Sequence, residues 1–95
     1  MVLIIVNYTK PLEEIKKLLP EHIKFTKNAC KEGKFIFNGP RKTHTGGICI
    51  ANTSLEEAQE IIKGSPFYLN QAAEHEFIEF DMLSWDDRFS CFINK

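Results

Sequence analysis

The chain has 95 residues, of which 43% are hydrophobic, 12 are Lys or Arg and 13 are Asp or Glu, so its formal net charge is -1. This length suits one domain and is too short for two. The even charge balance argues against a nucleic-acid binder, which usually carries a clear basic excess. The lysine cluster Lys10, Lys16 and Lys17 is read as a solvated helix face, with a basic patch as the alternative.

Two features of the sequence bear on where the protein works. No apolar run approaches the roughly 20 residues of a membrane span, and the first residues lack the pattern of a signal peptide. The three cysteines, Cys30, Cys49 and Cys91, form neither an even disulfide framework nor a CxxC pair. Free thiols in a reducing compartment are therefore expected, and the sequence predicts a cytoplasmic protein without membrane contact.

The first third of the chain predicts a strand followed by a helix. Residues 1–8 are largely β-branched and apolar, which favours a strand with apolar side chains on both faces. Residues 11–31 carry apolar residues at helical spacing, and Gly33 fits the helix stop. Pro20 is expected to interrupt or restart this helix, because proline lacks an N–H and crowds the preceding turn. That break would place His22 in the first turn of a second helical piece.

The remaining elements follow from alternation and capping signals. Residues 34–38 predict a strand with Phe35 and Phe37 on one face, ended by Gly39-Pro40, and residues 48–52 predict another. Residues 54–63 are the clearest helix, because Ser54 and Glu57 have the spacing of a capping box. Residues 75–81 predict the last strand.

This order predicts an α+β fold of βαββαβ type, in which a four-stranded antiparallel sheet carries two helices on one face. Every strand has apolar residues on both faces, whereas a sheet open to water on one side should alternate apolar and polar residues. The uncovered face therefore needs a partner, and a second copy of the chain is the simplest one. Residues 82–95 are too apolar for a disordered tail. We expect this extension to pack on the domain or on the dimer partner, and to bury Trp85 or Phe89.

A series of short motifs resembles the YciI-like, or YCII-related, family. Each motif alone is weak, but their order and spacing over residues 1–81 are fairly specific. They are Leu19-Pro20-Glu21-His22, Glu32-Gly33-Lys34-Phe35, Asn38-Gly39-Pro40, Thr45-Gly46-Gly47, Ser54-Leu55-Glu56-Glu57-Ala58, Ser65-Pro66-Phe67 and Phe77-Ile78-Glu79-Phe80. The resemblance implies a ferredoxin-like fold that pairs as a dimeric α+β barrel, with residues 1–81 as the domain.

The resemblance also implies a pocket with a His–Asp dyad. His22 matches the position of the family histidine, but Ser65 stands where the family has the aspartate. Asn38 stands where the family often has serine before Gly-Pro, and a glycine usually found after Pro-Phe looks replaced near Gln71. One branch of the family resembles enzymes that eliminate or isomerise small aromatic or lactone-like compounds.

His22 is the best candidate for catalysis, because imidazole titrates near neutrality and can act as general acid or base. The alternative is a histidine that only borders its helix. Ser65 would orient His22 through a hydrogen bond but supplies no negative charge. A Ser–His nucleophile is the other interpretation of the pair, although Gly64-Ser65-Pro66 reads as a helix exit turn. The candidate catalytic residues are thus His22 and Ser65.

Asn38, Gly39 and Pro40 are the candidate ligand-binding residues, at the edge of the expected pocket. The Asn38 amide can donate and accept, which suits a carboxylate or phenol, whereas the plainer interpretation is an ordinary turn. The histidines and cysteines have no standard zinc spacing, and no glycine-rich phosphate loop opens a helix, so neither a metal nor another cofactor is predicted.

Three functions remain in competition. The first is a small-molecule lyase or isomerase that uses His22 as general base. The second is a noncatalytic ligand-binding domain that kept the pocket and lost the dyad. The third is a dimeric partner-binding module with the region from Trp85 to Phe92 as its contact surface. A deep pocket containing His22 would favour the first two.

Overall fold

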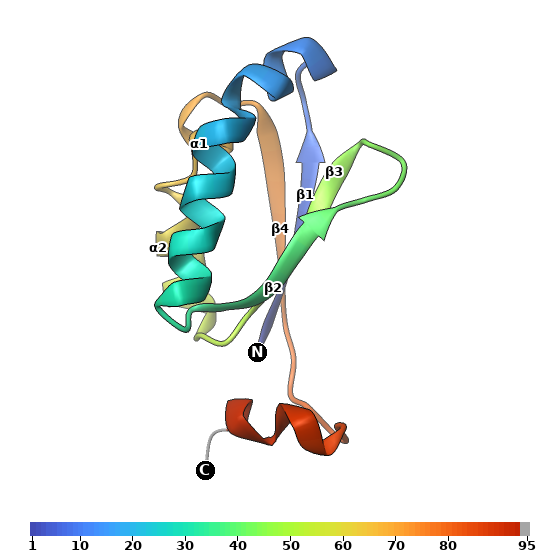
Figure 1. Cartoon of the computed structure of the whole chain (residues 1–95), viewed down its shortest axis with the longest axis vertical. Helices are drawn as coiled ribbons and strands as arrows, with labels where there is room; N and C mark the ends of the chain where they lie inside the picture. The colour runs from blue at the N-terminus through green and yellow to red at the C-terminus, as the bar shows by residue number, and fades with distance from the viewer. Residues whose placement is uncertain (94–95) are drawn as a thin grey trace.

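A computed structural model describes residues 1–93 of the chain and confirms the ferredoxin-like fold. The sheet has the order β2-β3-β1-β4 and is antiparallel throughout, and the helices cover one of its faces (Figure 1). The elements in chain order are β1 (Val2–Tyr8), α1 (Leu12–Lys31), β2 (Phe35–Pro40), β3 (Gly46–Ala51), α2 (Leu55–Ile62), α3 (Pro66–Leu69), β4 (Ala73–Glu79) and the 3-10 helix η1 (Asp87–Phe92). No helix in this part of the chain is long and apolar enough to cross a bilayer.

The core lies between the sheet and the helices. In the central strand β1, Val2, Ile4 and Val6 alternate along the chain and are all buried on the helix side. They pack with side chains from every helix of the domain, including Ile15, Ala58 and Phe67. The alternation of β1 thus sets one face of the sheet against the helices.

The opposite face of the sheet is also apolar and is open to solvent in the single chain. Cross-strand pairing puts one set of residues together on this face: Leu3, Ile5, Phe37, Ile48, Ile50 and Ile78. Phe37 is 52% exposed, and Ile48 and Ile78 are each 41% exposed. We call this set the open apolar face.

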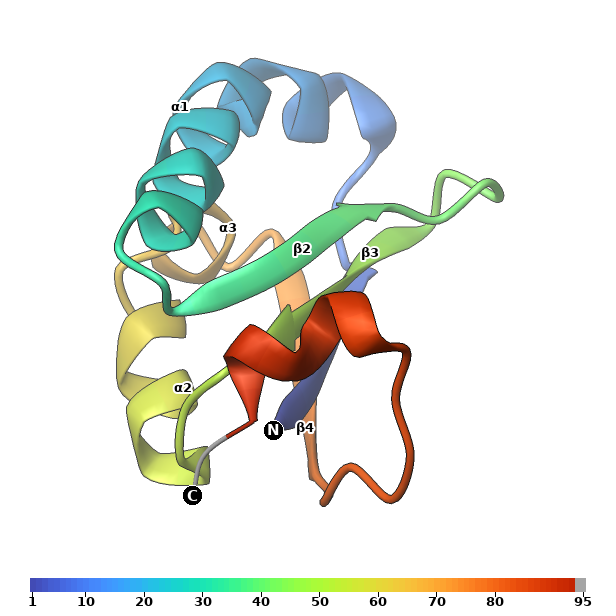
Figure 2. The same cartoon turned by 60° about the horizontal axis from the view of Figure 1, so that its bottom comes forward.

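Pro20 lies inside a continuous helix, so the predicted break in residues 11–31 was wrong. Proline removes the hydrogen bond that its own N–H would donate and crowds the preceding turn, but the packed face of α1 keeps the remaining turns helical. The axis of α1 changes direction in its first half, as expected of a helix with an internal proline (Figure 2). His22 is therefore in the helix interior and not in a first turn.

An irregularity in β2 separates two phenylalanines that were predicted to share a face. Phe35 pairs with Ala51 and Phe37 pairs with Ile50, so the register shifts by one residue between them. Such a bulge puts an extra residue in one strand and sends the following side chains to the opposite faces. Phe35 is consequently buried in the core, whereas Phe37 lies on the open apolar face. The same shift pairs Asn38 with Cys49 and places it on the helix side of the sheet.

Half of the predicted capping box is present at α2. The Ser54 hydroxyl accepts a hydrogen bond from the Glu57 backbone N–H at 3.1 Å. The Glu57 carboxylate does not return to Ser54 but pairs with the Lys34 ammonium at 2.5 Å. An ion pair between opposite charges is the stronger bond for a carboxylate, which explains the choice.

Residues 82–93 extend away from the domain and end in η1 (Figure 1). The Asp86 side chain caps η1 by accepting from the Arg88 N–H at 2.9 Å. The apolar side chains of this segment are not buried in the single chain: Leu83 is 95% exposed, Trp85 43% and Phe89 37%. Neither Trp85 nor Phe89 is thus buried within one chain, as one of them was expected to be if the segment packs on its own domain.

Candidate functional site

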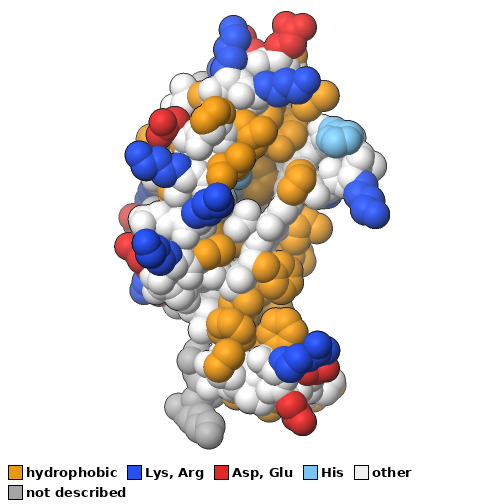
Figure 3. All heavy atoms as spheres, viewed as in Figure 1, with side chains coloured by type: hydrophobic (Ala, Val, Ile, Leu, Met, Phe, Trp, Pro, Cys, Tyr) orange, Lys and Arg blue, Asp and Glu red, His pale blue; other side chains and the backbone are white. Residues whose placement is uncertain are grey.

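A cavity of about 560 Å³ lies between α1 and the sheet. Its walls come from all four strands of the sheet, from α1, and from α2, α3 and the segment that joins them. Figure 3 shows it as a hollow among hydrophobic side chains beside α1. All five residues predicted for the site line this cavity: His22, Asn38, Gly39, Pro40 and Ser65.

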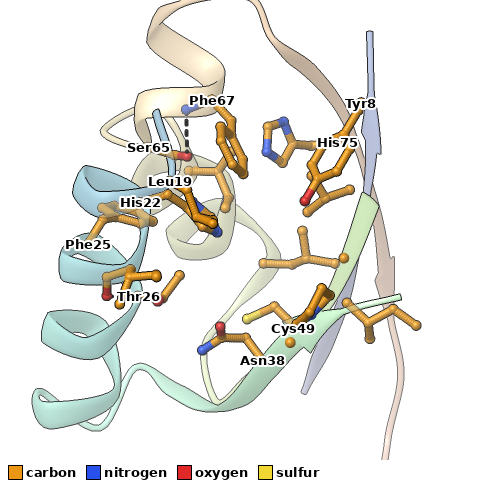
Figure 4. A pocket seen from close by; sticks show the side chains of 18 of the residues that line it. Tyr8, Leu19, His22, Phe25, Thr26, Asn38, Cys49, Ser65, Phe67 and His75 are labelled. Atoms are coloured by element: carbon orange, nitrogen blue, oxygen red, sulfur yellow. Dashed lines mark hydrogen bonds between the residues drawn. The ribbon is translucent and has the colours of Figure 1, made fainter. Parts of the chain in front are cut away.

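His22 extends from the middle of α1 into the cavity (Figure 4). Its ring stacks on the Phe67 ring, with 4.0 Å between the centroids and 18° between the planes. Its Nδ1 atom is buried and has no hydrogen-bond partner among the described residues. Burial lowers the pKa of His22 to about 4, and the nearby His75 adds to the effect. At neutral pH, His22 is therefore an uncharged imidazole.

Ser65 is almost completely buried, with 1% of its surface exposed. Its Oγ accepts a hydrogen bond from the Phe67 N–H at 3.2 Å and thereby caps α3. Since Nδ1 of His22 has no partner in residues 1–93, the structure brings Ser65 to the cavity without using it to orient His22. The hydrogen bond that Ser65 makes therefore fits the interpretation of Gly64-Ser65-Pro66 as a turn at a helix end.

Asn38 reaches the cavity because of the shift in β2, and its amide lies at the end of the pocket opposite Ser65 in Figure 4. Its Nδ2 donates a long hydrogen bond of 3.6 Å to the Cys30 thiol. Gly39 and Pro40 belong to β2, which continues past its predicted end, and they pair with Ile48 and Gly47 of β3. These three residues form the β2 wall of the cavity.

Several polar residues of the cavity were not predicted for the site, and the two that matter most here are His75 and Tyr8. His75 lies opposite Val6 in the β1–β4 ladder and so points to the helix side of the sheet, as does Tyr8 at the end of β1. Burial lowers the pKa of His75 and raises the pKa of Tyr8. The signal that places His75 is the alternation of β4, in which Ala73, His75 and Phe77 are each partly buried between exposed glutamates.

The lining of the cavity contains no Asp or Glu side chain within residues 1–93. In the same part of the chain, no group of three or more His, Cys, Asp or Glu side chains is placed to hold a metal ion. The polar side chains in the lining include the imidazoles of His22 and His75, a phenol, an amide and the exposed Lys16. This set can move protons and bind a polar substituent of an otherwise apolar molecule.

Comparison with protein families finds one match, the YCII-related domain, over residues 1–81. The chain belongs to the YCII-related family. Among curated proteins, no significant match to this YCII-related chain was found. Among solved structures, one similar chain is the 5-chloro-2-hydroxyhydroquinone dehydrochlorinase of Burkholderia phenoliruptrix AC1100 in complex with 2,5-dihydroxybenzoquinone. Its TM-score is 0.69 at 17% sequence identity, over 85% of this chain and 94% of the other. A likeness at this identity shows a common fold.

The YCII-related fold puts both positions of the family's implied dyad at this cavity, because His22 and Ser65 line it together. Ser65 cannot supply the charge of an aspartate. No other carboxylate from residues 1–93 enters the lining in its place. The cavity therefore keeps the histidine of the family pattern without an acidic partner.

Proposed function

We propose that this YCII-related protein binds a small ring compound in the cavity and that His22 acts as general base in an elimination or isomerisation. The observations that carry the proposal are that His22 lines a cavity large enough for a small molecule and that its buried Nδ1 has no hydrogen-bond partner in residues 1–93. In an elimination, the proton would go to His22 while the leaving group departs with the bonding electrons. In an isomerisation, His22 would return the proton to another atom.

The protonation state of His22 supports this role. A general base must be uncharged to accept a proton, and burial keeps the pKa of His22 well below neutrality. The stacked Phe67 ring holds the plane of the imidazole, which is part of what an orienting carboxylate does elsewhere. Without a negative partner the resulting imidazolium gains no ion pair, so we expect a weaker base than one in a His–Asp dyad.

The aromatic and aliphatic walls of the cavity suit a planar ring with polar substituents. Phe25, Phe35 and Phe67 supply aromatic surface, and Tyr8 and Asn38 supply groups that can hydrogen bond. The structurally similar dehydrochlorinase is described with a dihydroxybenzoquinone bound. That fold-level likeness makes hydroxylated quinones and hydroquinones the first compounds to test here.

The test uses 2,5-dihydroxybenzoquinone in D2O, with exchange of its ring hydrogens followed by NMR. General acid–base catalysis contributes about 10²–10⁴-fold, so we expect clear acceleration by the wild-type protein and its loss in His22→Gln. Glu21→Gln is the matched control, since Glu21 is the exposed neighbour of His22 on α1 and does not line the cavity. Chloride release from 5-chloro-2-hydroxyhydroquinone is the second assay. Equal exchange rates in wild type and His22→Gln would reject His22 as the base.

A noncatalytic ligand-binding domain is the second candidate. Ser65 in place of the family aspartate favours it, because the cavity remains while the acidic partner is lost. This alternative predicts that 2,5-dihydroxybenzoquinone binds to the wild-type protein without accelerated exchange. The cavity itself argues against a module that only binds a protein partner.

We also propose that the protein acts as a homodimer in the cytoplasm. The open apolar face supports the dimer, since soluble monomers rarely leave a contiguous apolar surface of this kind exposed. The three cysteines, Cys30, Cys49 and Cys91, are free thiols, which fits a reducing compartment.

A further inference from the structure

We propose that His75 is a second functional residue of the cavity and that it forms, with His22, a binding pair for the anionic group of a small ring acid, which enters with uptake of one proton. The acid class is a phenol, enol or carboxylic acid attached to an aromatic or similar planar ring. The inference rests on the proposed function only in that both place a small molecule in the same cavity.

The two histidines reach the cavity from independent elements. His22 comes from α1 and His75 from β4, and both rings point into the space beside Phe67 (Figure 4). The register fixes His75 opposite Val6 on the buried side of the sheet. Its ring lies 6.5 Å from the Phe77 ring and 6.3 Å from the Tyr68 ring, measured between centroids. Aromatic rings thus lie beside each imidazole at the cavity wall, Phe67 beside His22 and Tyr68 and Phe77 near His75.

The electrostatics of the cavity favour an anion. The titratable side chains in its lining are Tyr8, Lys16, His22, His44, Cys49 and His75, and none of them is an acid that is charged at neutral pH. Burial raises the pKa of Cys49 to about 12, so that thiol stays protonated. Arg41 is close enough to Tyr8 to lower its pKa against the effect of burial. Among residues 1–93, no side chain in the lining of the cavity is therefore negatively charged at neutral pH.

An anion would change the protonation of this pair. Both imidazoles are uncharged in the empty cavity, because burial lowers the pKa of His22 and of His75. A negative group close to an imidazole favours the imidazolium form and raises that pKa. A proton from solvent then joins one ring nitrogen, and the N–H donates to the bound anion. The complex contains the same number of protons if the neutral acid enters instead and gives its own proton to the imidazole.

The coupling between the histidines limits the uptake to one proton. His75 already lowers the pKa of His22 through like-charge repulsion, so protonating one ring makes it harder to protonate the other. One anion and one imidazolium form a neutral pair in the apolar cavity, whereas a second imidazolium would leave an unpaired buried charge. Lys16 is the competing counter-ion, but its side chain is exposed to solvent.

The experiment measures benzoate binding by titration calorimetry between pH 5 and pH 8, in buffers of different ionisation enthalpy. Benzamide is the neutral probe of the same shape. We expect benzoate to bind with uptake approaching one proton, and its affinity to fall by up to tenfold per pH unit above the pKa of the complex. Benzamide binding should not depend on pH. Benzoate binding without proton uptake would overturn the proposal and assign the anion to Lys16, and no benzoate binding at millimolar concentrations would overturn the ligand class.

Substitutions test whether His75 takes part in the proton uptake that accompanies benzoate binding. His75→Gln keeps a hydrogen-bonding side chain without a titratable ring, and we expect it to weaken benzoate at least tenfold while leaving benzamide within twofold. Glu74→Gln is the matched control, because Glu74 is exposed on β4 and its side chain lies on the opposite face from His75. Unchanged benzoate affinity and proton uptake in His75→Gln would overturn the role of His75. Ring-hydrogen exchange is scored separately, so its failure rejects general base catalysis while leaving proton-linked binding of benzoate as an independent result.

Discussion

The imidazole of His22 and the phenyl ring of Phe67 lie nearly parallel, with their centroids 4.0 Å apart. The helix α1 provides one ring and the short helix α3 the other, so this contact joins two walls of the cavity. Phe67 is 1% exposed and packs within the hydrophobic core. The contact therefore excludes water from one face of the imidazole, which disfavours its charged form.

Stability should fall as the pH drops through the range between the unfolded and folded pKa values of His22. The pKa is 6.5 in the unfolded chain and about 4 in the fold, so below pH 6.5 the unfolded state binds the extra proton. The contribution is fully present above pH 6.5 and is lost progressively towards pH 4. We expect the free energy of unfolding of wild type to lose about 1 kcal/mol more than that of His22→Gln between pH 7 and pH 5, after allowing for solvent screening. Urea denaturation at both pH values measures it.

Two observations would contradict this expectation. If His22→Gln loses as much stability as wild type over the same interval, other groups account for the pH dependence. If the NMR midpoint of His22 is above 6.5, the ring has an acidic partner in solution. Glu21→Gln should follow wild type at both pH values.

Gln71 occupies a backbone conformation that favours glycine, with φ of 53°. Its backbone N–H donates to Tyr68 O and its carbonyl accepts from Thr9 Oγ1, so the turn holds it there. A left-handed conformation costs a residue with a Cβ roughly 1–2 kcal/mol, and glycine's greater entropy loss offsets part of the gain. We expect Gln71→Gly to raise the free energy of unfolding by about 0.5–1 kcal/mol. Thermal and urea denaturation measure this.

The control for the glycine effect is Gln59→Gly, in the exposed side of α2. Glycine in a helix interior is unfavourable by about 0.8–1.0 kcal/mol relative to alanine. The two substitutions are chemically identical and should move stability in opposite directions. A loss of stability in both would mean that Gln71 makes side-chain contacts that outweigh its backbone strain.

The fold was predictable because its signals are local. The β-branched run of β1 and the Ser54 cap of α2 each determine one element without help from the rest of the chain. The family resemblance implied a glycine near position 71, and the positive φ of Gln71 is a backbone conformation that favours glycine. The break expected at Pro20 was wrong, because the packing of α1 keeps it one helix, and no local pattern states that packing.

The site was only partly predictable, for reasons that are not local. The bulge in β2 depends on the pairing of β2 with β3, and it decides that Asn38 faces the cavity while Phe37 faces away. His75 was visible as a strand residue, but its side depends on the register with β1. That residues 1–93 place no carboxylate in the lining follows from the whole set of walls and not from Ser65 alone.

The open apolar face should form a homodimer interface. A stable interface buries about 1,200–2,000 Å² in total, and a lysine in its centre should prevent that burial. We expect sedimentation to give twice the 11.0 kDa of one chain for wild type, and a monomer for Phe37→Lys. Leu69→Lys is the matched control, since Leu69 is 66% exposed on α3, on the helix side of the sheet. A wild-type monomer at micromolar concentrations would reject the dimer.

We propose that residues 82–93 pack on the dimer partner, because Trp85 and Phe89 remain more than a third exposed in the single chain. Burying such a ring contributes about 1.5–3 kcal/mol of stabilisation, and the single chain lacks this contribution. Trp85 is the only tryptophan, so its fluorescence reports on this segment alone. We expect its emission to shift to shorter wavelength as dimer forms with rising concentration, and to remain at longer wavelength in monomeric Phe37→Lys. Removal of residues 82–95 should then weaken the dimer at least tenfold. Rapid proteolysis to residue 81 with dimer strength unchanged would show that the segment packs on neither copy.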